Sequence, residues 1–599
     1  MFQTFEVTSR PEQGPPRLAA LRRAMVEQGL DTLIVPREDA FQGEYVAPCD
    51  ERLKWLTGFT GSAGFAVVTR DVAGVFVDGR YRVQVCSQVA PEFTPVNWPE
   101  VNLADWLTKH LTSGAVVGFD PWLHTVKAIA DLEAKLAPAG ITLRPGPNLI
   151  DPLWEDRPAP PKPPFSAYPI ENAGEPHAEK RARLAKSLRD AGQPAAVLTL
   201  PDSIAWLLNI RGADIERNPV PQCYAILYDD AKVLLFAHPG KTDVIVQHLG
   251  PDVTTHPIDQ FEAALAGLFG PVRLDPASAP EAVRAILEAA GTDIARAQDP
   301  CSLPKACKNP VELEGARAAH LRDGAAMVQF LAWLDAEAPK GGLTEIAVVE
   351  ALEGFRRATN ALRDISFETI CGAGEHGAIV HYRVTEDTDR PVRNGELLLV
   401  DSGGQYLDGT TDITRTIAVG PPPEDAAESY TAVLQGMIAI SRARFPRGVT
   451  GGHLDSLARF PLWTLGRDYD HGTGHGVGAY LSVHEGPQRL SRISDVPLDE
   501  GMILSNEPGY YREGAFGIRI ENLIAVIAAP KISGGDDRDM LAFETLTWVP
   551  FDRRLILTDR LSPQERDWIN WYHAATLQHI GPRVDDATLI WLTQACAAL

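Results

Sequence analysis

Histidine is concentrated in one short segment of the chain. Residues 468–487, DYDHGTGHGVGAYLSVHEGP, contain His471, His475 and His484, three of the fifteen histidines in 599 residues. The first two stand four positions apart, a spacing that on a helix places both imidazoles on one face and suits zinc. Glycine, however, occupies every second position from 472 to 478, and each glycine inside a helix costs about 1 kcal/mol. We therefore expect an extended or looping backbone that passes close to another group.

Two carboxylates lie in a segment with the pattern of a β-hairpin. In ELLLVDSGGQYLDGTTDITRTIAV, the apolar residues 397–400 predict a buried strand that ends at Asp401. Glycines and an Asp-Gly pair then turn the chain. A β-branched strand that carries Asp412 returns from Thr410. This hairpin places two acidic groups beside apolar strands.

A second predicted hairpin carries two glutamates. In MILSNEPGYYREGAFGIRIENLIAVI, a strand over 502–506 leads into Glu507, a turn follows near 512–514, and a strand over 517–528 carries Glu521. Acidic residues are poor strand formers, and buried carboxylates are rare unless they are paired or bind a metal. The two hairpins and the histidine segment therefore form one candidate site.

Each of these residues, taken alone, also has an ordinary structural interpretation. These alternatives are a strand-end cap for Asp401, a solvent-facing position for Asp412, a turn before proline for Glu507, an ion pair with Arg519 for Glu521 and a satisfied core position for His475. Five metal-ligand types on neighbouring apolar strands are harder to explain one at a time. Together they favour a shared function.

The combined ligand set predicts a pair of metal ions. Four carboxylates and one imidazole are more than one ion needs and enough for two, and the set is rich in oxygen. Bridging carboxylates hold two ions about 3.5–4 Å apart, which is the geometry of two-metal hydrolysis. Without cations, a close pair of carboxylates repels by about 4 kcal/mol at an effective dielectric constant near 20. The residues alone thus predict a dinuclear metallohydrolase of unspecified substrate.

The N-terminal half of the chain contains an internal duplication. Residues 17–40 with 53–78, and residues 183–212 with 221–237, share one order of elements. Each copy predicts an amphipathic helix, a short apolar strand, a helical Trp-Leu segment and two strands joined by an Asp-containing turn. We therefore expect two related α/β domains.

Proline and a change of pattern mark the predicted domain boundaries. Seven prolines between residues 150 and 169 predict a stiff linker, and long helical patterns begin after CSLPKACKNPVELEG, residues 301–315. We predict domain I over 1–155, domain II over 156–308 and a catalytic domain over 309–599. Helices should cover the end of the third domain from about residue 551.

Composition indicates an ordinary globular protein. The chain is 45% hydrophobic and 23% charged, with a net charge of −23 spread along its length, which argues against nucleic acid and anionic membranes as partners. No apolar run is long enough to span a bilayer, and the N-terminus lacks the pattern of a signal peptide. The seven cysteines are scattered without a C-x-x-C pair, which fits a reducing compartment. We expect a cytoplasmic protein.

Five motifs give the chain a family resemblance. DSGGQYLDGTTDITRT, HGTGHGVG, VHEGP, SNEPGYY and GIRIEN stand in the order found in the Xaa-Pro aminopeptidases (aminopeptidase P), members of the pita-bread metallopeptidase superfamily. The two aspartates are eleven positions apart and the two glutamates fourteen, as in that family. The resemblance covers essentially the whole chain. It implies two creatinase-like N-terminal α/β domains, a pita-bread catalytic domain and a helical C-terminal extension, that is, a multidomain α+β and α/β protein.

The resemblance also implies roles for the candidate residues. Asp401 and Asp412 would hold the metals, with Asp412 bridging, while His475 and Glu507 would bind one ion and Glu521 both. Glu507 would also carry a proton. The implied catalytic and substrate-binding histidines are His381, His471 and His484, and Tyr511 and Arg519 would contact the substrate. His471 could instead support the wall of the proline pocket, and Tyr511 and Arg519 could simply pack and pair. The chain departs from the family at His376, where asparagine is usual.

The implied activity is removal of an N-terminal residue that precedes proline. Two divalent cations, manganese by preference and otherwise zinc or cobalt, would turn a shared water into hydroxide and polarise the scissile carbonyl. The scissile Xaa-Pro bond lacks an N–H, so a dedicated pocket is needed. The resemblance further implies a homodimer. Two alternatives remain: a prolidase that cuts only Xaa-Pro dipeptides, and a non-catalytic binding protein with the same fold.

Overall fold

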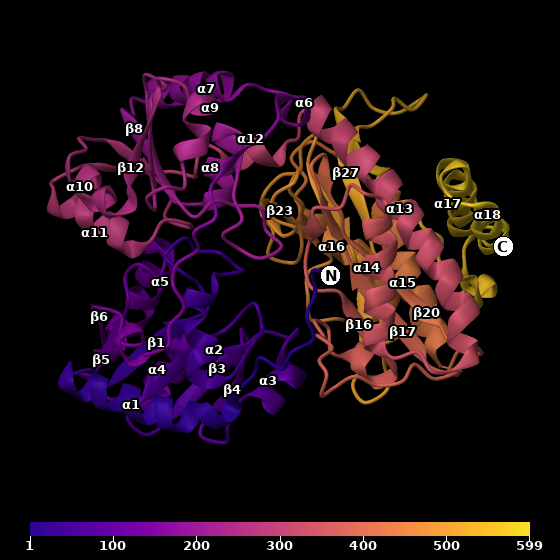
Figure 1. Ribbon diagram of the computed structural model, residues 1–599, viewed down its shortest axis with the longest axis horizontal. Helices are drawn as coiled ribbons and strands as arrows, with labels where there is room; N and C mark the ends of the chain where they lie inside the picture. The colour runs from indigo at the N-terminus through magenta and orange to yellow at the C-terminus, as the bar shows by residue number, and fades with distance from the viewer. Residues whose placement is uncertain (424) are drawn as a thin grey trace. The chain divides into compact units, whose positions relative to one another are not determined.

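The computed structural model describes residues 1–423 and 425–599 (Figure 1). The chain forms two units, Thr8–Lys305 and Ala306–Leu599, and residues Met1–Val7 belong to the second of them. The first unit contains both predicted α/β domains, and the second contains every residue of the candidate site. The predicted domain boundaries at 155 and 308 stay predictions.

The first unit contains two six-stranded sheets with the same topology. Their strand orders are β4-β3-β2-β1-β5-β6 and β12-β11-β10-β8-β13-β14. In both sheets the three central antiparallel strands are flanked by parallel neighbours. The strands of the first sheet are β1 (Thr32–Pro36), β2 (Phe65–Thr69), β3 (Ala73–Val77), β4 (Thr94–Asn97), β5 (Val116–Phe119) and β6 (Thr142–Pro145). Those of the second are β8 (Ala195–Leu198), β10 (Tyr224–Tyr228), β11 (Val233–Ala237), β12 (Val253–Pro257), β13 (Val272–Leu274) and β14 (Ile294–Arg296).

The helices of the first unit confirm the predicted duplication. Each copy has a long first helix and a short Trp-containing helix, namely α1 (Gly14–Glu27) with α2 (Arg52–Thr57), and α7 (His177–Asp190) with α8 (Pro201–Leu208). The remaining main helices are α3 (Arg82–Gln88), α4 (Leu103–His110), α5 (Val126–Leu136), α10 (Phe261–Ala266) and α11 (Glu281–Ala289). Strands β1 and β8 are buried along their whole length, as continuous apolar runs in α/β sheets require.

A buried carboxyl group links the two α/β copies within the first unit. Asp39 Oδ2 accepts a hydrogen bond from Gln222 Nε2 at 3.0 Å, and its Oδ1 accepts from the backbone N–H groups of Phe41 and Gly43. Burial, reinforced by the charge of Asp50, raises the pKa of Asp39 to about 7. This titrating group lies outside the candidate site and bears on the pH dependence considered below.

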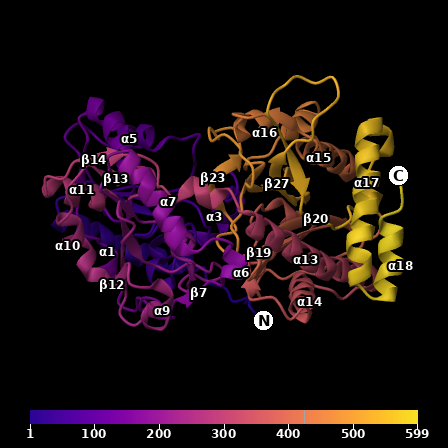
Figure 2. The same cartoon turned by 90° about the horizontal axis from the view of Figure 1, so that it is seen from above.

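In the second unit, strands lie between two pairs of helices (Figure 2). The helices are α13 (Pro310–Glu337), α14 (Glu345–Ala358), α15 (Ala426–Ser441) and α16 (Gly451–Trp463). The sheets have the orders β15-β18-β19, β16-β17-β20, β21-β28-β27-β24-β22-β23 and β25-β26. Their strands are β15 (Asp364–Ile365), β16 (Ile370–Ala373), β17 (Leu397–Ser402), β18 (Gly404–Tyr406), β19 (Gly409–Thr410), β20 (Ile413–Ala418), β21 (Arg444–Pro446), β22 (Gly474–Gly476), β23 (Glu485–Leu490), β24 (Ile503–Asn506), β25 (Gly509–Arg512), β26 (Phe516–Arg519), β27 (Asn522–Ala528) and β28 (Met540–Thr545).

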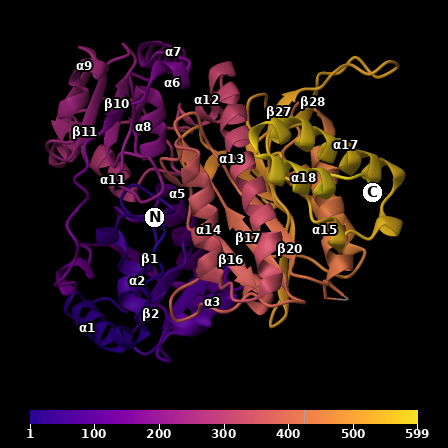
Figure 3. The same ribbon diagram turned by 45° about the vertical axis from the view of Figure 1, so that its right-hand side comes forward.

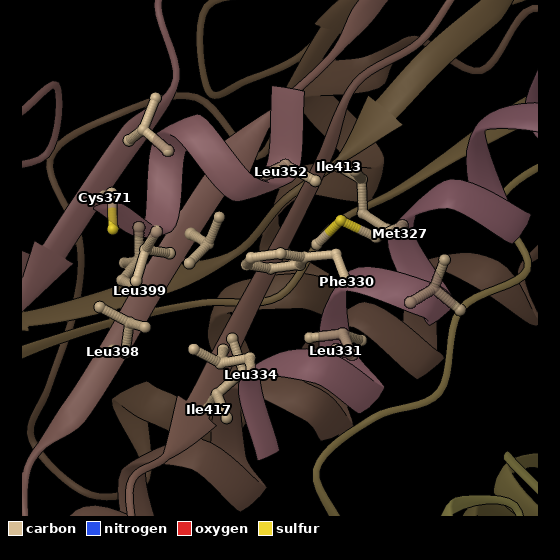
Figure 4. Packing of buried hydrophobic residues seen from close by; sticks show 14 of the residues in the cluster. Met327, Phe330, Leu331, Leu334, Leu352, Cys371, Leu398, Leu399, Ile413 and Ile417 are labelled. Carbon is tan, nitrogen blue, oxygen red and sulfur yellow. The ribbon is translucent and has the colours of Figure 1, made fainter. Parts of the chain in front are cut away.

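Helix α13 starts at a strong N-terminal signal and carries much of the core. Pro310 occupies its first turn, and Asn309 and Glu312 form a reciprocal capping box. Met327 and Phe330 of this helix pack with Leu352 of α14 and Leu398 of β17 (Figure 4). Burying each such side chain contributes about 1.5–3 kcal/mol. This core fixes the two helices against the sheet that carries Asp401.

The N-terminal residues of the chain pack on the second unit. Phe2 donates its backbone N–H to Glu353 Oε1 at 2.8 Å, and Gln3 Oε1 accepts from the Thr369 N–H at 2.8 Å. The Glu386 N–H donates to Phe5 O at 2.9 Å. Residues 1–7 therefore form a strap over α14 and the segment that follows it.

Two helices follow the sheets at the C-terminus, as predicted. They are α17 (Pro563–Ile580) and α18 (Asp586–Ala595), and both pack against α13 (Figure 3). Ser562 and Glu565 form a capping box at the start of α17. The predicted fold class, two related α/β domains followed by a mixed domain with a helical extension, is confirmed. Among the described residues, none of the helices is both long and apolar enough to cross a bilayer.

Candidate metal centre

The aspartate hairpin is built by strands β17 and β20. These strands pair antiparallel, with Asp401 opposite Thr414. Strand β17 continues through Ser402, one residue beyond the predicted end at Asp401. Asp412 lies in the break between β19 and β20. Both aspartates are buried, so the solvent-facing alternative for Asp412 is wrong.

The two glutamates come together because β24 and β27 pair with Asn506 opposite Asn522. Glu507 and Glu521 each stand one residue beyond that pair, outside the strands. The predicted strand over 517–528 is in fact two strands, β26 and β27, with Glu521 in the break. The break lets the backbone N–H of Glu521 donate to Thr414 O at 3.2 Å, so the two hairpins join beside the carboxylates.

The glycine-rich segment confirms the predicted extended backbone. A Cβ atom on Gly474 would lie 1.9 Å from Ser505 O, and one on Gly476 would lie 2.4 Å from Glu485 O. Glycine is required at both positions because neighbouring backbone approaches too closely for any side chain. Between them, His475 donates its backbone N–H to Ser505 Oγ at 2.9 Å. This contact ties the histidine to β24, the strand that ends at Asn506, one residue before Glu507.

His475 presents one ring nitrogen to two of the carboxylates. Its Nδ1 lies 2.9 Å from Gly476 O, a hydrogen bond that requires the proton on Nδ1 and leaves Nε2 as the atom that can bind a metal when the ring is neutral. That Nε2 lies 3.5 Å from Asp412 Oδ2 and 3.4 Å from Glu507 Oε1. Ligand atoms of Asp412, His475 and Glu521 lie within 4.8 Å of one another. The structure therefore gathers these four side chains.

The carboxylate oxygens fit divalent cations. Asp401 Oδ1, Asp412 Oδ1 and Glu521 Oε1 are buried without a hydrogen-bond partner, and leaving such an oxygen unsatisfied costs about 1–3 kcal/mol or more for a charged group. Oxygen-rich sets of this kind bind hard or borderline divalent ions. The five candidate residues could thus hold a pair of cations.

The raised pKa values of the buried carboxyl groups also favour the binding of cations at this site. Burial and the neighbouring charges of Asp401 and Glu507 raise the pKa of Asp412 well above its ordinary value. Burial and Asp412 do the same to the pKa of Glu521, and burial raises the pKa of Glu507 despite the opposing effect of His475. Crowded buried carboxylates resist ionisation together. Cations would relieve this repulsion.

A hydrogen-bonded relay leads from Asp401 to His471. Arg519 Nη2 donates to Asp401 Oδ2 at 2.6 Å, and its Nη1 donates to the Tyr511 hydroxyl at 2.6 Å. The same hydroxyl lies 2.9 Å from His471 Nε2, whose Nδ1 lies 2.8 Å from Gly472 O. Arg519 therefore forms its ion pair with Asp401, and not with Glu521 as the ordinary interpretation of Glu521 supposed. Burial raises the pKa of Tyr511 to about 12, so the hydroxyl stays protonated.

The other two predicted histidines, His484 and His381, have different relations to the candidate metal ligands. The His484 ring lies edge-on to the His475 ring, with centroids 4.3 Å apart. His381 follows Val380, whose carbonyl oxygen accepts from Arg519 Nη1 at 3.3 Å. This contact brings the backbone beside His381 to the relay. Their catalytic and substrate-binding roles stay predictions.

His376, the departure from the family pattern, lies against a buried carboxylate. Its Nδ1 is 3.0 Å from both oxygens of Glu345, which also accepts from the Ala373 N–H and the Tyr382 hydroxyl. The segment Gly374–Ala378 packs against β26, the strand that carries Arg519. His376 thus lies near the site without contacting a candidate ligand.

Sequence reasoning missed the residues that support the ligands. Thr414 Oγ1 donates to Glu521 Oε2 at 2.8 Å, and Ser505 Oγ donates to Glu507 Oε1 at 3.1 Å. Arg459 of α16 donates to Asp455 Oδ2 at 2.7 Å and to His471 O at 2.6 Å, which holds the histidine segment. Threonine and serine are common in strands, so the sequence carries no signal for these roles.

Comparison with known proteins gives a consistent result over the whole chain. Residues 314–528 match metallopeptidase family M24, and residues 539–599 match the C-terminal region of the same peptidases. Residues 17–153 and 156–312 each match a creatinase/prolidase N-terminal domain. The predicted pair of creatinase-like domains before a catalytic domain is thereby confirmed.

Individual relatives are similar over nearly their full length. A probable Xaa-Pro aminopeptidase P from Laccaria bicolor is 38% identical, covering 97% of this chain and 93% of that protein. Aminopeptidase P1 from Arabidopsis thaliana is 37% identical, covering 96% and 98%. The crystal structure of X-prolyl aminopeptidase from Caenorhabditis elegans, a cytosolic enzyme with a di-nuclear active site, has a TM-score of 0.93 at 34% identity and covers 98% and 100%. An Xaa-Pro dipeptidase from Bacillus anthracis, at 24% identity and a TM-score of 0.50, shares the fold over 63% of this chain and 99% of its own.

Proposed function

The chain belongs to metallopeptidase family M24, and we propose from that membership that it is a metalloaminopeptidase that removes the N-terminal residue from peptides with proline at position 2. The observation that carries this function is the gathering of Asp412, His475 and Glu521, whose ligand atoms lie within 4.8 Å of one another among orphaned carboxylate oxygens. The similarity to Xaa-Pro aminopeptidases over 97% of the chain supports the substrate class.

We propose that five side chains hold two divalent cations: Asp401, Asp412, His475, Glu507 and Glu521. Manganese is the preferred ion because the ligand set is rich in oxygen and has no thiolate, although zinc and cobalt also suit it. When bound, two such cations lower the pKa of water and polarise the scissile carbonyl. The orphaned oxygens of Asp401, Asp412 and Glu521 support their assignment as ligands.

Glu507 is the proposed proton carrier. Its carboxylate lies 3.4 Å from His475 Nε2, and burial raises its pKa toward the range in which a carboxyl group can both accept and return a proton. Ser505 Oγ, 3.1 Å from Glu507 Oε1, fixes the orientation of the carboxylate. Glu507 therefore accepts the proton of the attacking water and returns it to the leaving proline nitrogen.

Three histidines are proposed to face the substrate. The scissile Xaa-Pro bond offers no N–H, so the enzyme must recognise its carbonyl oxygen and the proline ring. We assign His381 and His484, whose ring lies beside that of His475, as donors to that carbonyl oxygen. One such donor contributes about 2.7–4 kcal/mol to transition-state stabilisation. His471, held by Tyr511, forms one wall of the proline pocket.

We also propose a homodimer formed through α16. Leu457, Phe460 and Trp463 share one face of this helix and are 43%, 62% and 43% exposed. Ile493, which is 85% exposed, follows Arg492, whose guanidinium lies 6.0 Å from the Trp463 ring. An exposed apolar stripe of this kind is unusual on a monomer. A second copy of the chain supplies a self-complementary partner for it.

The cell compartment is proposed by similarity. The Caenorhabditis elegans relative is described as cytosolic, and a cytoplasmic location suits a protein whose seven described cysteines are free. Expression of the full chain with a fluorescent tag would test this location. Accumulation in a secreted or membrane fraction would contradict it.

Peptide length separates the proposed activity from that of a prolidase. The purified protein, with and without added manganese, zinc or cobalt, is assayed on a Xaa-Pro dipeptide and on matched Xaa-Pro-Yaa and longer peptides. Release of the first residue from the longer peptides, dependent on metal, is expected. Cleavage confined to the dipeptides would contradict an aminopeptidase, and no cleavage with no metal uptake would favour a binding protein.

A further inference from the structure

Arg415 is a buried cation whose hydrogen-bond partners are all neutral. This residue of β20 is 1% exposed and donates to Thr414 O, Glu521 O, Asn522 Oδ1, Val549 O, Pro550 O and the Tyr572 hydroxyl. The ring of Phe551 lies 4.8 Å from its guanidinium carbon. A buried charge is costly, so a guanidinium surrounded by neutral acceptors calls for an explanation beyond packing.

One side of the Arg415 guanidinium holds the backbone around a candidate metal ligand. Nη1 donates to Glu521 O at 2.6 Å and to Thr414 O at 2.9 Å. Thr414 in turn donates its hydroxyl to Glu521 Oε2 at 2.8 Å. Arg415 therefore fixes both the main chain of the glutamate and the residue that orients its carboxylate.

The other side of the guanidinium is held by the C-terminal region. Nη2 donates to Val549 O at 2.7 Å and to the Tyr572 hydroxyl at 3.2 Å, and Nε donates to Pro550 O at 3.1 Å. The Tyr572 hydroxyl accepts the Val549 N–H at 3.1 Å. Tyr572 lies on α17, which packs against α13 and α15 (Figure 3). The planar fork of an arginine, with five N–H donors, can span both sides at once.

We infer that the C-terminal region is a positioning element of the metal centre, in which Tyr572 holds Arg415 and Arg415 holds Glu521 in its metal-binding orientation. This inference rests on the proposed function, because it takes Glu521 as a metal ligand. Groups that orient ligands through hydrogen bonds change metal affinity about 10–100-fold when removed. The helices after residue 551 would then serve the site and not only cover the domain.

Substitution of Tyr572 tests the inference with a matched control. Tyr572→Phe removes the hydroxyl beside Arg415 and keeps the ring. Tyr430→Phe removes another fully buried tyrosine hydroxyl that bonds to the same C-terminal segment, accepting the Asp552 N–H at 3.1 Å without bonding to Arg415. Manganese is titrated into metal-stripped full-length protein by calorimetry, and thermal unfolding of the metal-free variants is measured in parallel.

The expected result is a difference in metal affinity between variants of similar stability. Tyr572→Phe should weaken binding of at least one manganese ion about tenfold, whereas Tyr430→Phe should bind manganese like the wild type. Arg415→Lys, which keeps the charge and loses the fork, should weaken it further and provides a second test if Tyr572→Phe folds poorly. Wild-type manganese affinity in both Tyr572→Phe and Arg415→Lys would overturn the inference.

The same titrations separate this inference from the proposed function. A wild-type protein that binds two manganese ions and cleaves Xaa-Pro-Yaa peptides, with unchanged affinity in both Tyr572→Phe and Arg415→Lys, would overturn only the positioning role. A wild-type protein that binds manganese but cleaves no Xaa-Pro peptide would overturn the function, while a weakened Tyr572→Phe would still support the positioning role. Failure of the wild type to bind any ion would overturn both.

Discussion

Arg519 Nη2 donates to Asp401 Oδ2 at 2.6 Å, and both side chains are buried. This ion pair places a permanent positive charge beside a cluster of four carboxylates. Burial disfavours the charge of Arg519, but Tyr511, Asp401 and Glu507 outweigh that effect and raise its pKa well above the ordinary value. The arginine thus offsets part of the carboxylate repulsion and links Asp401 through Tyr511 to His471.

Removal of Arg519 should therefore destabilise the metal-free protein. Arg519→Met leaves Asp401 buried without its partner, and breaking such a pair costs about 3–5 kcal/mol. Urea unfolding at pH 7 in the presence of a chelator measures the loss. As a control, Arg447→Met breaks an exposed pair with Asp499 and Glu500 and should leave unfolding unchanged. A loss in Arg519→Met no larger than in the control would show that the pair is not stabilising.

The metal-free protein should become more stable as the pH falls toward 5. The pKa values of Asp412, Glu507 and Glu521 are raised in the folded state, so the folded state binds more protons than the unfolded state between the ordinary carboxyl pKa near 4 and the raised values. In that window the free energy of unfolding decreases as the pH rises. Thermal unfolding with a chelator across this pH range gives the slope.

Bound manganese should abolish the pH dependence of stability that comes from Asp412, Glu507 and Glu521, and it should raise the melting temperature. Ions that bind only the folded state stabilise it by about 2.7 kcal/mol at one hundred times their Kd. Asp39, whose pKa of about 7 is also raised by burial, contributes a slope of the same sign in both forms. The difference between the chelated and the manganese-loaded curves therefore isolates the cluster. Coincident curves would argue against bound cations at these carboxylates.

Substitution of Glu507 should stop turnover while the fold persists. Glu507→Gln keeps the size of the side chain and removes the proton carrier, so kcat on a Xaa-Pro-Yaa peptide should fall by about 10²–10⁴. Glu513→Gln changes an exposed glutamate in the loop between β25 and β26 and should leave kcat unaltered. A Glu507→Gln enzyme with the wild-type kcat would contradict the assigned role.

A charge on the exposed face of α16 should dissociate the proposed dimer. Phe460→Glu places a carboxylate in the centre of the apolar stripe formed with Leu457 and Trp463. Light scattering coupled to gel filtration should show a mass near 65.1 kDa for the variant and twice that for the wild type. Glu substituted for the exposed Val244, which lies outside this face, should leave the mass at the wild-type value. A monomeric wild type would remove the basis for this interface.

The fold class followed from local patterns in the sequence. Helical and strand periodicities repeat in the two N-terminal α/β copies, and the structure gives both copies one strand order. Glycine at every second position excluded a helix around His475, and the backbone approach of Ser505 O to Gly474 gives the physical reason. Such features depend on the types of residues that lie within a few positions of each other, so they can be predicted from the sequence.

The ligand candidates themselves were also visible in the sequence, because acidic residues interrupt otherwise apolar strands. The ionic partner of Arg519 was not visible. Its nearest acidic neighbour along the chain is Glu521, yet it pairs with Asp401, which lies 118 positions away. Arg519 on β26 and Asp401 on β17 belong to different sheets. Only the packing of these two strands against each other in the folded domain brings the two side chains together.

The hydrogen bonds that support the metal ligands from behind, such as the one between Arg415 and Tyr572, depend on the tertiary structure alone. Arg415 and Tyr572 stand 157 positions apart, and nothing near either residue in the sequence indicates that they share a hydrogen bond. The sequence by itself determined the residue types that can hold cations and the elements that carry them. Only the folded structure brings α17, which carries Tyr572, next to Arg415 and the backbone of Glu521. Buried donors and acceptors find their partners through packing, whatever their separation along the chain.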